Sequence, residues 1–342
     1  LRAYMHWGDD CFARFNGMWA IVIWDRLENL LVASRDPFGI KPLHYVRLGA
    51  DWAFASECRA LLQLPGVSTA PSDESIRSFM AEYRAPIGDE TFYENVKQVL
   101  PGTLLKVRRD GTASERFWHP NESAKARYRD EDEALEAFRE LFASSVSMRL
   151  RSDVRVGTMV SGGLDSTSVI YEMHSALTEG NPDAASLGRQ LQGFNASVEG
   201  LEIDETDRVN ELMACLDLTT HFVRPLQADD VPELYHHSVE HMDGPYFNSV
   251  PVVNRLLMRR ARSEGVKVVL NGHGADEQFA GYPPKYNAPM IAFYLKHGNW
   301  IRAFRQYRGM RELMGISSLG VLYQALPHKM RPRTWARSTD PK

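Results

Sequence analysis

Cysteine is scarce in this sequence. Its 342 residues include three cysteines, Cys11, Cys58 and Cys215, which lie far apart. An odd number of widely separated cysteines argues against a disulfide framework and against a metal site built from paired cysteines. We therefore expect a reducing, cytoplasmic setting and interpret Cys11 and Cys58 as buried thiols.

Long apolar runs and an excess of one charge sign are lacking as well. The longest apolar run, Met18–Trp24, has seven residues, whereas a transmembrane helix needs about 20. Lys and Arg total 40 and Asp and Glu total 44, for a net charge of −4. This balance provides no basic field, so we expect neither nucleic acid nor a membrane as a partner. No apolar signal-peptide segment follows Leu1, and because an initiator methionine is missing we treat both ends as cut.

The first 120 residues are predicted to be rich in strands. The chain length of 342 residues is enough for about two domains of ~150 residues each, and a hydrophobic fraction of 44% makes a sizeable core available. Because Met18–Trp24 is continuously apolar, it predicts a strand buried on both faces. Further strands are predicted at Leu30–Ser34, Leu43–Arg47, Trp52–Ser56, Gly102–Val107 and Thr112–Trp118, with short helices at Glu57–Leu62 and Asp73–Glu82.

Helices and strands alternate in the rest of the chain. A polar stretch, Pro120–Asp130, leads into a helix on which Asp130 and Glu133 resemble a capping box. Apolar residues then recur at helical spacing, at Leu135, Phe138, Leu141, Phe142 and Val146. Strands are predicted at Val154–Val160, Gln190–Phe194, Thr219–Val223 and Val266–Leu270, helices at Asp165–Leu177, Glu205–Leu216, Pro232–Met242 and Val250–Arg262, and a wholly helical tail after Tyr282. This alternation predicts a parallel sheet covered by helices, with ligands at the carboxyl ends of its strands.

The strongest motif is the segment Ser161–Ser166 (SGGLDS), placed where a predicted strand ends and a helix begins. Two glycines let successive N–H groups face one concavity, and the helix N-terminus adds partial positive charge, so the segment suits a pyrophosphate. Asp165 would repel phosphate directly and instead suits Mg²⁺. The alternative is an ordinary turn in which Asp and Ser cap the helix.

A second loop, Asn271–Glu277 (NGHGADE), also follows an apolar strand. Asp276 lies 111 residues after Asp165, and two carboxylates at strand ends of one sheet could hold a single hard cation. The alternative for this loop is a helix start at which acidic side chains complement the helix dipole.

Together these loops resemble the synthetase domain of the glutamine-dependent asparagine synthetases, a family of ATP pyrophosphatases. Ser161–Ser166 matches the family's pyrophosphate loop, and Asn271–Glu277 with Gly281-Tyr282 matches its second segment. Phe15–Ala20, Arg35–Leu43 and Phe54–Glu57 are similar to the later part of the family's glutaminase domain. The resemblance implies a partial N-terminal-nucleophile glutaminase domain, a layered β-sandwich flanked by helices, at 1–120. A linker at 121–130 and an adenine-nucleotide α-hydrolase-like domain at 131–342 would follow.

The resemblance also implies roles for individual residues. Asp165 and Asp276 would bind Mg²⁺, and they would form the catalytic group together with His273. The residues implied to bind ATP are Met159, Ser161, Gly162, Gly163, Asp165, Ser166, Ala196, Asn271 and Gly272.

The chain departs from the family pattern at three points. The family's cysteine nucleophile would precede Leu1, and its catalytic lysine and acceptor-binding segment would follow Lys342. His273 stands where the family has a glutamate near the acyl-adenylate, which leaves the acceptor carboxylate open.

The implied reaction is ATP-dependent amide formation in the cytoplasm. A carboxylate, aspartate or a related acid, would be adenylated by MgATP and then amidated by ammonia from glutamine. The expected partners are these small molecules, and a homodimer is compatible with them. Two alternatives stay open: a relative of β-lactam synthetases or peptide-macrocycle cyclases that uses an internal amine, and an ATP-binding remnant without turnover.

Two weaker features have simpler interpretations. His237 and His241 are four residues apart on a predicted helix, but without a third ligand they favour a solvated helix face over a metal site. Asp204 and Glu205 could approach a nucleotide, and an N-cap role is favoured.

Overall fold

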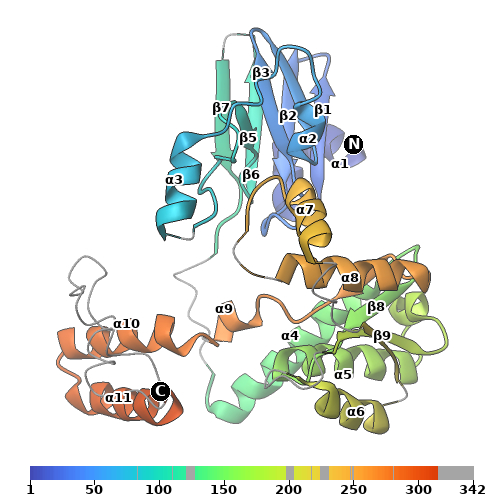
Figure 1. Ribbon diagram of the computed structural model, residues 1–342, viewed down its shortest axis with the longest axis vertical. Coiled ribbons are helices and arrows are strands. Elements are labelled where there is room, and N and C mark those ends of the chain that lie inside the picture. Colours follow the sequence, from blue (N-terminus) through green and yellow to red (C-terminus); the bar gives the residue numbers. More distant parts are fainter. Residues whose placement is uncertain are drawn as a thin grey trace. The chain divides into compact units, whose positions relative to one another are not determined.

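The computed structural model describes residues 1–314 except 83, 110, 121–127, 198–203, 217, 224–230, 247, 249 and 280. The chain is a mixed α/β protein with two compact units (Figure 1). The first contains Leu1–Ala137 and Pro225–Met258, and the second contains Phe138–Arg224 and the chain from Arg259 onward. Most of the predicted linker, 121–130, lies outside the described residues. In the described ranges, no helix combines the length and apolarity that crossing a membrane requires.

Two antiparallel sheets organise the first unit, with strand orders β1-β2-β6-β7 and β4-β3-β5. The strands are β1 Ala20–Asp25, β2 Leu30–Arg35, β3 His44–Leu48, β4 Asp51–Ala55, β5 Val96–Gln98, β6 Thr103–Arg108 and β7 Gly111–Arg116. The helices are α1 Arg2–Trp7, the 3₁₀ helix η1 Gly8–Arg14, α2 Cys58–Leu61, α3 Asp73–Glu82 and α7 Val231–His241. The prediction of a β-rich first part is confirmed.

Alternation along the strands of the first unit creates its layers. On β2, Val32 packs with Cys11 and Phe12 of η1. Its neighbour Ala33 faces a cluster that includes Tyr45 of β3, in the second sheet, and Leu43, the residue before β3. Successive side chains of a strand point to opposite faces, so β2 separates these two cores. On the far side of the second sheet, β3 and β5 pack against α2. The order of layers is therefore helix, sheet, sheet, helix.

The prediction that Met18–Trp24 is a strand buried on both faces is wrong. Strand β1 begins at Ala20 and lies at the edge of its sheet. Ile21 and Ile23 pack against the η1 core, whereas Val22 is 41% and Trp24 56% exposed. A continuous apolar run resembles a doubly buried strand, but only the surrounding elements decide whether its second face is covered.

A buried carboxylate shapes the loop after β2. Asp36 is fully buried, and its oxygens accept hydrogen bonds from the backbone N–H groups of Trp19, Phe38, Ile40 and Lys41 at 2.9–3.3 Å. A buried charge is tolerated when several donors satisfy it. The conformation of the loop that carries the Arg35–Leu43 motif therefore depends on this one side chain.

The second unit is built on a parallel sheet with strand order β10-β9-β8-β11, which confirms the predicted parallel sheet. Its strands are β8 Val156–Met159, β9 Leu191–Ala196, β10 Leu218–Val223 and β11 Val268–Leu270. Its helices are α5 Leu164–Thr178, the 3₁₀ helix η2 Pro182–Leu187, α6 Thr206–Cys215, α9 Ala275–Phe279, α10 Pro283–Lys296 and α11 Trp300–Met314. Two further helices, α4 Glu131–Leu150 and α8 Val250–Ser263, each have residues in both units. Strand β8 is central, with β9 and β11 as its neighbours, so loops that follow β8 and β11 leave the same edge of the sheet.

Helix α4 buries less of its predicted apolar stripe than its periodicity indicates. Val146 and Leu150 enter the core of the second unit, but Leu135, Phe138 and Leu141 are 44%, 41% and 67% exposed. Periodicity predicts the face of a helix that is apolar, and a covering element is needed before that face is buried.

The start of α4 matches half of a capping box. The Asp130 carboxylate accepts the backbone N–H of Glu133 at 2.9 Å. The Glu133 carboxylate accepts the N–H of Arg129 instead of that of Asp130. The reciprocal bond of a full capping box is thus displaced by one residue.

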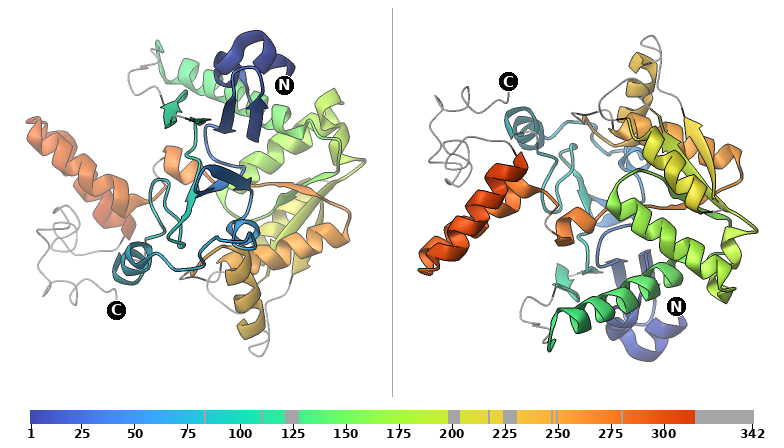
Figure 2. Two further views of the ribbon diagram at one scale, coloured as in Figure 1. Left: turned by 90° about the horizontal axis from the view of Figure 1, so that it is seen from above. Right: turned by 90° about the horizontal axis from the view of Figure 1, so that it is seen from below.

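The predicted helical tail is confirmed as far as Met314, where the described residues end. Helices α10 and α11 lie side by side (Figures 1 and 2), with Ile291 packed against Met310. The Asn287 carboxamide also pairs with that of Gln306 at 2.5 Å.

Candidate functional site

The first loop begins at the carboxyl end of the central strand β8. The N–H of Val160 donates to the carbonyl of Phe194 at 2.9 Å, and the Val160 carbonyl accepts from the Asn195 side chain at 2.7 Å. Asn195 is itself buried. Both bonds fix the residue before Ser161 to the neighbouring strand β9, so the loop starts from a rigid point.

Hydrogen bonds of two serine hydroxyls stabilise the conformation of the Ser161–Ser166 loop. The Ser161 and Ser166 Oγ atoms lie 2.5 Å apart. The N–H of Ser161 reaches Ser166 Oγ and the N–H of Gly163 reaches Ser161 Oγ, both at 3.3 Å. Ser166 is 8% exposed, and its Oγ also lies 3.0 Å from the Ser161 carbonyl. Ser166 thus holds the curl of the loop, and its contact with phosphate stays a prediction.

Asp165 lies in the first turn of α5, half-buried and beyond the cap position. The N-cap is Gly163, and no side chain caps this helix. The structure therefore does not use Asp165 as the N-cap that the simpler interpretation of this motif invokes. A carboxylate in a first helical turn is also stabilised by the helix dipole.

The second loop follows β11, which pairs in parallel with β8. The Asn271 side chain accepts the N–H of His273 at 3.1 Å, which turns the chain toward α9. Asp276 lies in the first turn of α9 and is half-buried, and its carbonyl accepts the N–H of Gly281 at 2.9 Å. His273 is exposed.

Gly272 brings the two loops into contact. A Cβ atom placed on Gly272 would lie 2.9 Å from the backbone carbon and Cβ of Asp165 and from the backbone nitrogen of Ser166. Real Cβ atoms do not approach backbone atoms so closely, so only glycine fits here. The end of β11 therefore lies directly against the first turn of α5.

The remaining predicted nucleotide contacts lie at the same edge of the sheet. Met159 ends β8 and is paired with Phe194, and Ala196 ends β9 and is paired with Val223 of β10. The structure thus gathers residues from three strand ends at one carboxyl edge, where ligands of open α/β sheets bind.

Two further residues of this edge were not predicted from the sequence. Asn195 anchors Val160, and in the described chain its Oδ1 atom is buried without a hydrogen-bond partner. Arg208, on α6, lies along Gly162, because an added Cβ there would be 2.5 Å from the Arg208 Cβ. Nothing in the sequence signalled either residue, since each belongs to a different element from the loop that it contacts.

Of the weaker sequence candidates, the two histidines behave as their simpler interpretation predicts, whereas the N-cap of α6 is Glu205, whose side chain makes no cap hydrogen bond. Asp204 accepts hydrogen bonds from Thr206, the first residue of α6, at its N–H and hydroxyl. His237 pairs with Glu240 at 3.2 Å, and His241 Nδ1 lies 2.7 Å from the His237 carbonyl. These contacts favour a solvated helix face for the two histidines.

Cys11 and Cys58 are buried, as predicted, with exposed fractions of 0% and 1%. Burial, followed by the neighbouring Asp243 carboxylate, raises the pKa of the Cys58 thiol to about 12. The carboxylate of Glu57, the residue before Cys58, pairs with Arg59.

Comparison with known proteins defines the class of each part of the chain. Residues 1–118 match the glutamine amidotransferase domain, and residues 137–340 match asparagine synthase. The chain belongs to the asparagine synthase family, as its motifs indicated.

Three relatives illustrate this membership. The glutamine-hydrolysing asparagine synthetase 1 of Bacillus subtilis (strain 168) is 30% identical over 82% of this chain and 42% of its own length. A putative asparagine synthetase of Methanocaldococcus jannaschii is 28% identical over 95% of this chain and 61% of its own length. Amidase chyE of Penicillium rubens is 27% identical over 82% and 42%. The chain therefore spans about half the length of the curated relatives that it matches.

Proposed function

We propose that this chain belongs to an ATP-dependent ligase that forms an amide from a carboxylate, aspartate or a related acid. The observation that carries the proposal is the contact of Gly272 with Asp165 and Ser166. It joins a glycine-rich loop, a helix N-terminus and a second acidic loop at one sheet edge. The membership of the chain in the asparagine synthase family supports the same chemistry.

In the first step a carboxylate oxygen attacks the α-phosphorus of ATP. An acyl–adenylate bond forms, the bond to the β-phosphate breaks, and pyrophosphate leaves. The loop N–H groups and the N-terminus of α5 would stabilise the charge that develops on the departing pyrophosphate. Arg208, exposed beside Gly162, adds a cation on this side of the loop.

Asp165 and Asp276 have the chemistry to hold Mg²⁺. Both are half-buried carboxylates in the first turn of a helix, one after each loop, and oxygen ligands are those that Mg²⁺ prefers. When bound, the ion would neutralise phosphate charge. The two carboxylates would keep it beside the pyrophosphate loop.

In the second step ammonia attacks the acyl carbon, AMP leaves and the nitrogen loses a proton. We propose glutamine as the source of this ammonia, because the first 118 residues match the glutamine amidotransferase domain. His273, exposed on the second loop, is the residue that we expect to influence which carboxylate is accepted.

Pyrophosphate release tests this function. The protein is incubated with ATP, Mg²⁺ and a panel of carboxylates, with and without ammonia, and AMP, ADP, pyrophosphate and phosphate are quantified. Release of AMP and pyrophosphate that depends on a carboxylate is expected, and ADP with phosphate would contradict the proposal. If product forms at the same rate with and without ammonia, and only from substrates that contain an amine, the cyclase alternative would be favoured. Binding of ATP without any release would favour the remnant.

A further inference from the structure

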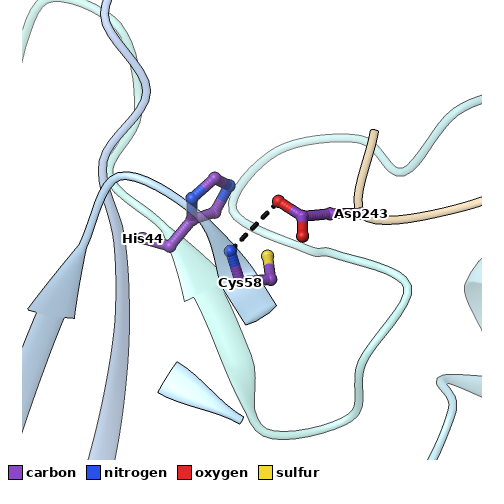
Figure 3. Close-up of side chains that lie close together, drawn as sticks. All are labelled: His44, Cys58 and Asp243. Atoms are coloured by element: carbon purple, nitrogen blue, oxygen red, sulfur yellow. Dashed lines mark hydrogen bonds between the residues drawn. The ribbon is translucent and has the colours of Figure 1, made fainter. Parts of the chain in front are cut away.

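Three side chains of different chemistry converge in the first unit, away from both loops of the proposed ligase site. His44 begins β3, Cys58 begins α2, and Asp243 lies two residues beyond the end of α7. One nitrogen, sulfur or oxygen atom from each lies within 4.8 Å of the other two. Figure 3 shows the three side chains turned toward one another. Among the residues that the structure describes, no other group of three or more metal-ligating side chains is this close.

Hydrogen bonds hold two of these groups in an orientation suited to a ligand. The Asp243 carboxylate accepts the backbone N–H groups of Cys58 at 3.0 Å and of Arg59 at 3.3 Å. The Nδ1 atom of His44 lies 3.2 Å from the Ser56 carbonyl, which requires a proton on Nδ1 and leaves the lone pair on Nε2. Histidines that bind metals are commonly fixed in this way, by a carbonyl that accepts the other ring N–H.

Packing fixes the position of Asp243 independently of any ion. A Cβ atom added to the next residue, Gly244, would lie 2.0 Å from the ring of Phe92, so the backbone here rests directly on that ring. Asp243 itself has φ +54, an uncommon conformation for a residue other than glycine. This backbone conformation costs free energy, and it places the Asp243 carboxylate beside Cys58 and His44.

We propose that His44, Cys58 and Asp243 form a zinc-binding site. Imidazole nitrogen, cysteine sulfur and carboxylate oxygen are the three ligand types of Zn²⁺, with bonds of about 2.0–2.3 Å. Mg²⁺ and Ca²⁺ prefer oxygen ligands alone, so the sulfur and nitrogen favour zinc. Three protein ligands leave the fourth tetrahedral position to water.

Binding replaces the thiol hydrogen of Cys58. The Sγ–H bond breaks, a Zn–Sγ bond forms, and the proton passes to solvent while zinc loses bound waters. No electron is transferred. The ion would link the segment after α7 to β3 and α2. Cys58 and Asp243, two of its ligands, are 185 residues apart in the sequence. The bound ion would thus cross-link these segments within the first unit.

Metal titration of matched variants tests this proposal. The 342-residue chain, purified without a histidine tag or chelator, is titrated with Zn²⁺ against a chromophoric chelator and separately with Co²⁺. Cys58→Ala is compared with Cys11→Ala, because both cysteines are buried in the same unit. His44→Gln and Asp243→Asn remove the other two ligands, and circular dichroism verifies that each variant is folded.

One equivalent of Zn²⁺ is expected, with a thiolate-to-cobalt charge-transfer band in the Co²⁺ form. Cys58→Ala and His44→Gln should weaken Zn²⁺ binding at least about 100-fold, because even outer-shell partners of metal ligands contribute about 10- to 100-fold. Cys11→Ala should bind like the unaltered chain. Failure to bind Zn²⁺, equal binding by Cys58→Ala and Cys11→Ala, or a charge-transfer band that survives in Cys58→Ala would each overturn the proposal. If Cys58→Ala does not fold, unchanged binding by His44→Gln overturns it.

Discussion

At the scale of single residues, Asp165 is the side chain on which the proposed adenylation depends most. We expect Asp165→Ala to lower Mg²⁺-dependent pyrophosphate release by roughly 10²- to 10³-fold, because loss of a metal ligand costs several kcal/mol of transition-state stabilisation. The readout is the initial rate at saturating ATP. Asp153→Ala is the control, since Asp153 is exposed on the segment before β8. Equal rates for the two variants would remove Asp165 from the mechanism.

His273 should determine the acceptor more than the nucleotide. It is exposed on the second loop, between two glycines and outside the Ser161–Ser166 loop. We expect His273→Glu to change the ranking of carboxylates while the apparent affinity for ATP stays within about threefold, a free-energy change below about 1 kcal/mol. His297→Glu is a control for the added charge, because His297 is exposed at the end of α10. A weaker ATP affinity with an unaltered carboxylate ranking would count against this role.

At the scale of elements, the fit of β11 against α5 depends on Gly272. We expect Gly272→Ala to weaken MgATP binding about tenfold or more, because a methyl group 2.9 Å from backbone atoms forces a shift that typically costs 1–3 kcal/mol. Isothermal titration gives the affinity and thermal unfolding reports the stability.

The control for this prediction is Gly309→Ala. Gly309 lies within α11, has no positive φ, and has nothing within 4 Å of an added Cβ. Alanine there should stabilise the chain by about 0.4–1 kcal/mol and leave MgATP binding unaltered. If both variants bind MgATP normally, the contact between the two loops is unimportant for the nucleotide.

Periodicity and turn chemistry predicted most elements of this chain, and they failed where a neighbour decides the outcome. Helix α3 has the predicted bounds, Asp73–Glu82, and the four strands of the parallel sheet lie at the predicted places. The exposed face of β1 and the exposed part of α4 were missed, because a local pattern does not reveal whether another element covers it. Strand β5, with three residues, is too short for a periodic signal.

The candidate site shows the same division. Glycines and acids after apolar strands predicted both loops, since these residue types carry a local signal. The anchoring of Val160 by Asn195 and the position of Arg208 beside Gly162 depend on the order of β9, β8 and α6 in space. The grouping of His44, Cys58 and Asp243 likewise requires contacts over almost 200 residues, which no local spacing encodes.

At the scale of the whole molecule, we expect the 342-residue chain by itself to lack glutaminase activity. A cysteine nucleophile must reach its substrate and form a thiolate. Cys11 and Cys58 are buried, and burial together with Asp9 raises the pKa of the Cys11 thiol. Incubation with glutamine and an assay for glutamate test this expectation. Glutamate release above that of a Cys11→Ala/Cys58→Ala double variant would show that one of these thiols is the nucleophile.

The pairing of β11 with β8 has a consequence for the order in which the protein takes shape during synthesis. Ribosomes add about 5–20 residues per second, so the 111 residues between Asp165 and Asp276 require roughly 6–22 seconds of translation. Throughout that interval the nascent chain has β8 and its loop but no neighbour on one side of the strand. A molecule that binds only when both loops are present cannot stabilise these early intermediates. The three strands β8, β9 and β10 must persist without help from ligand until the last strand, β11, emerges.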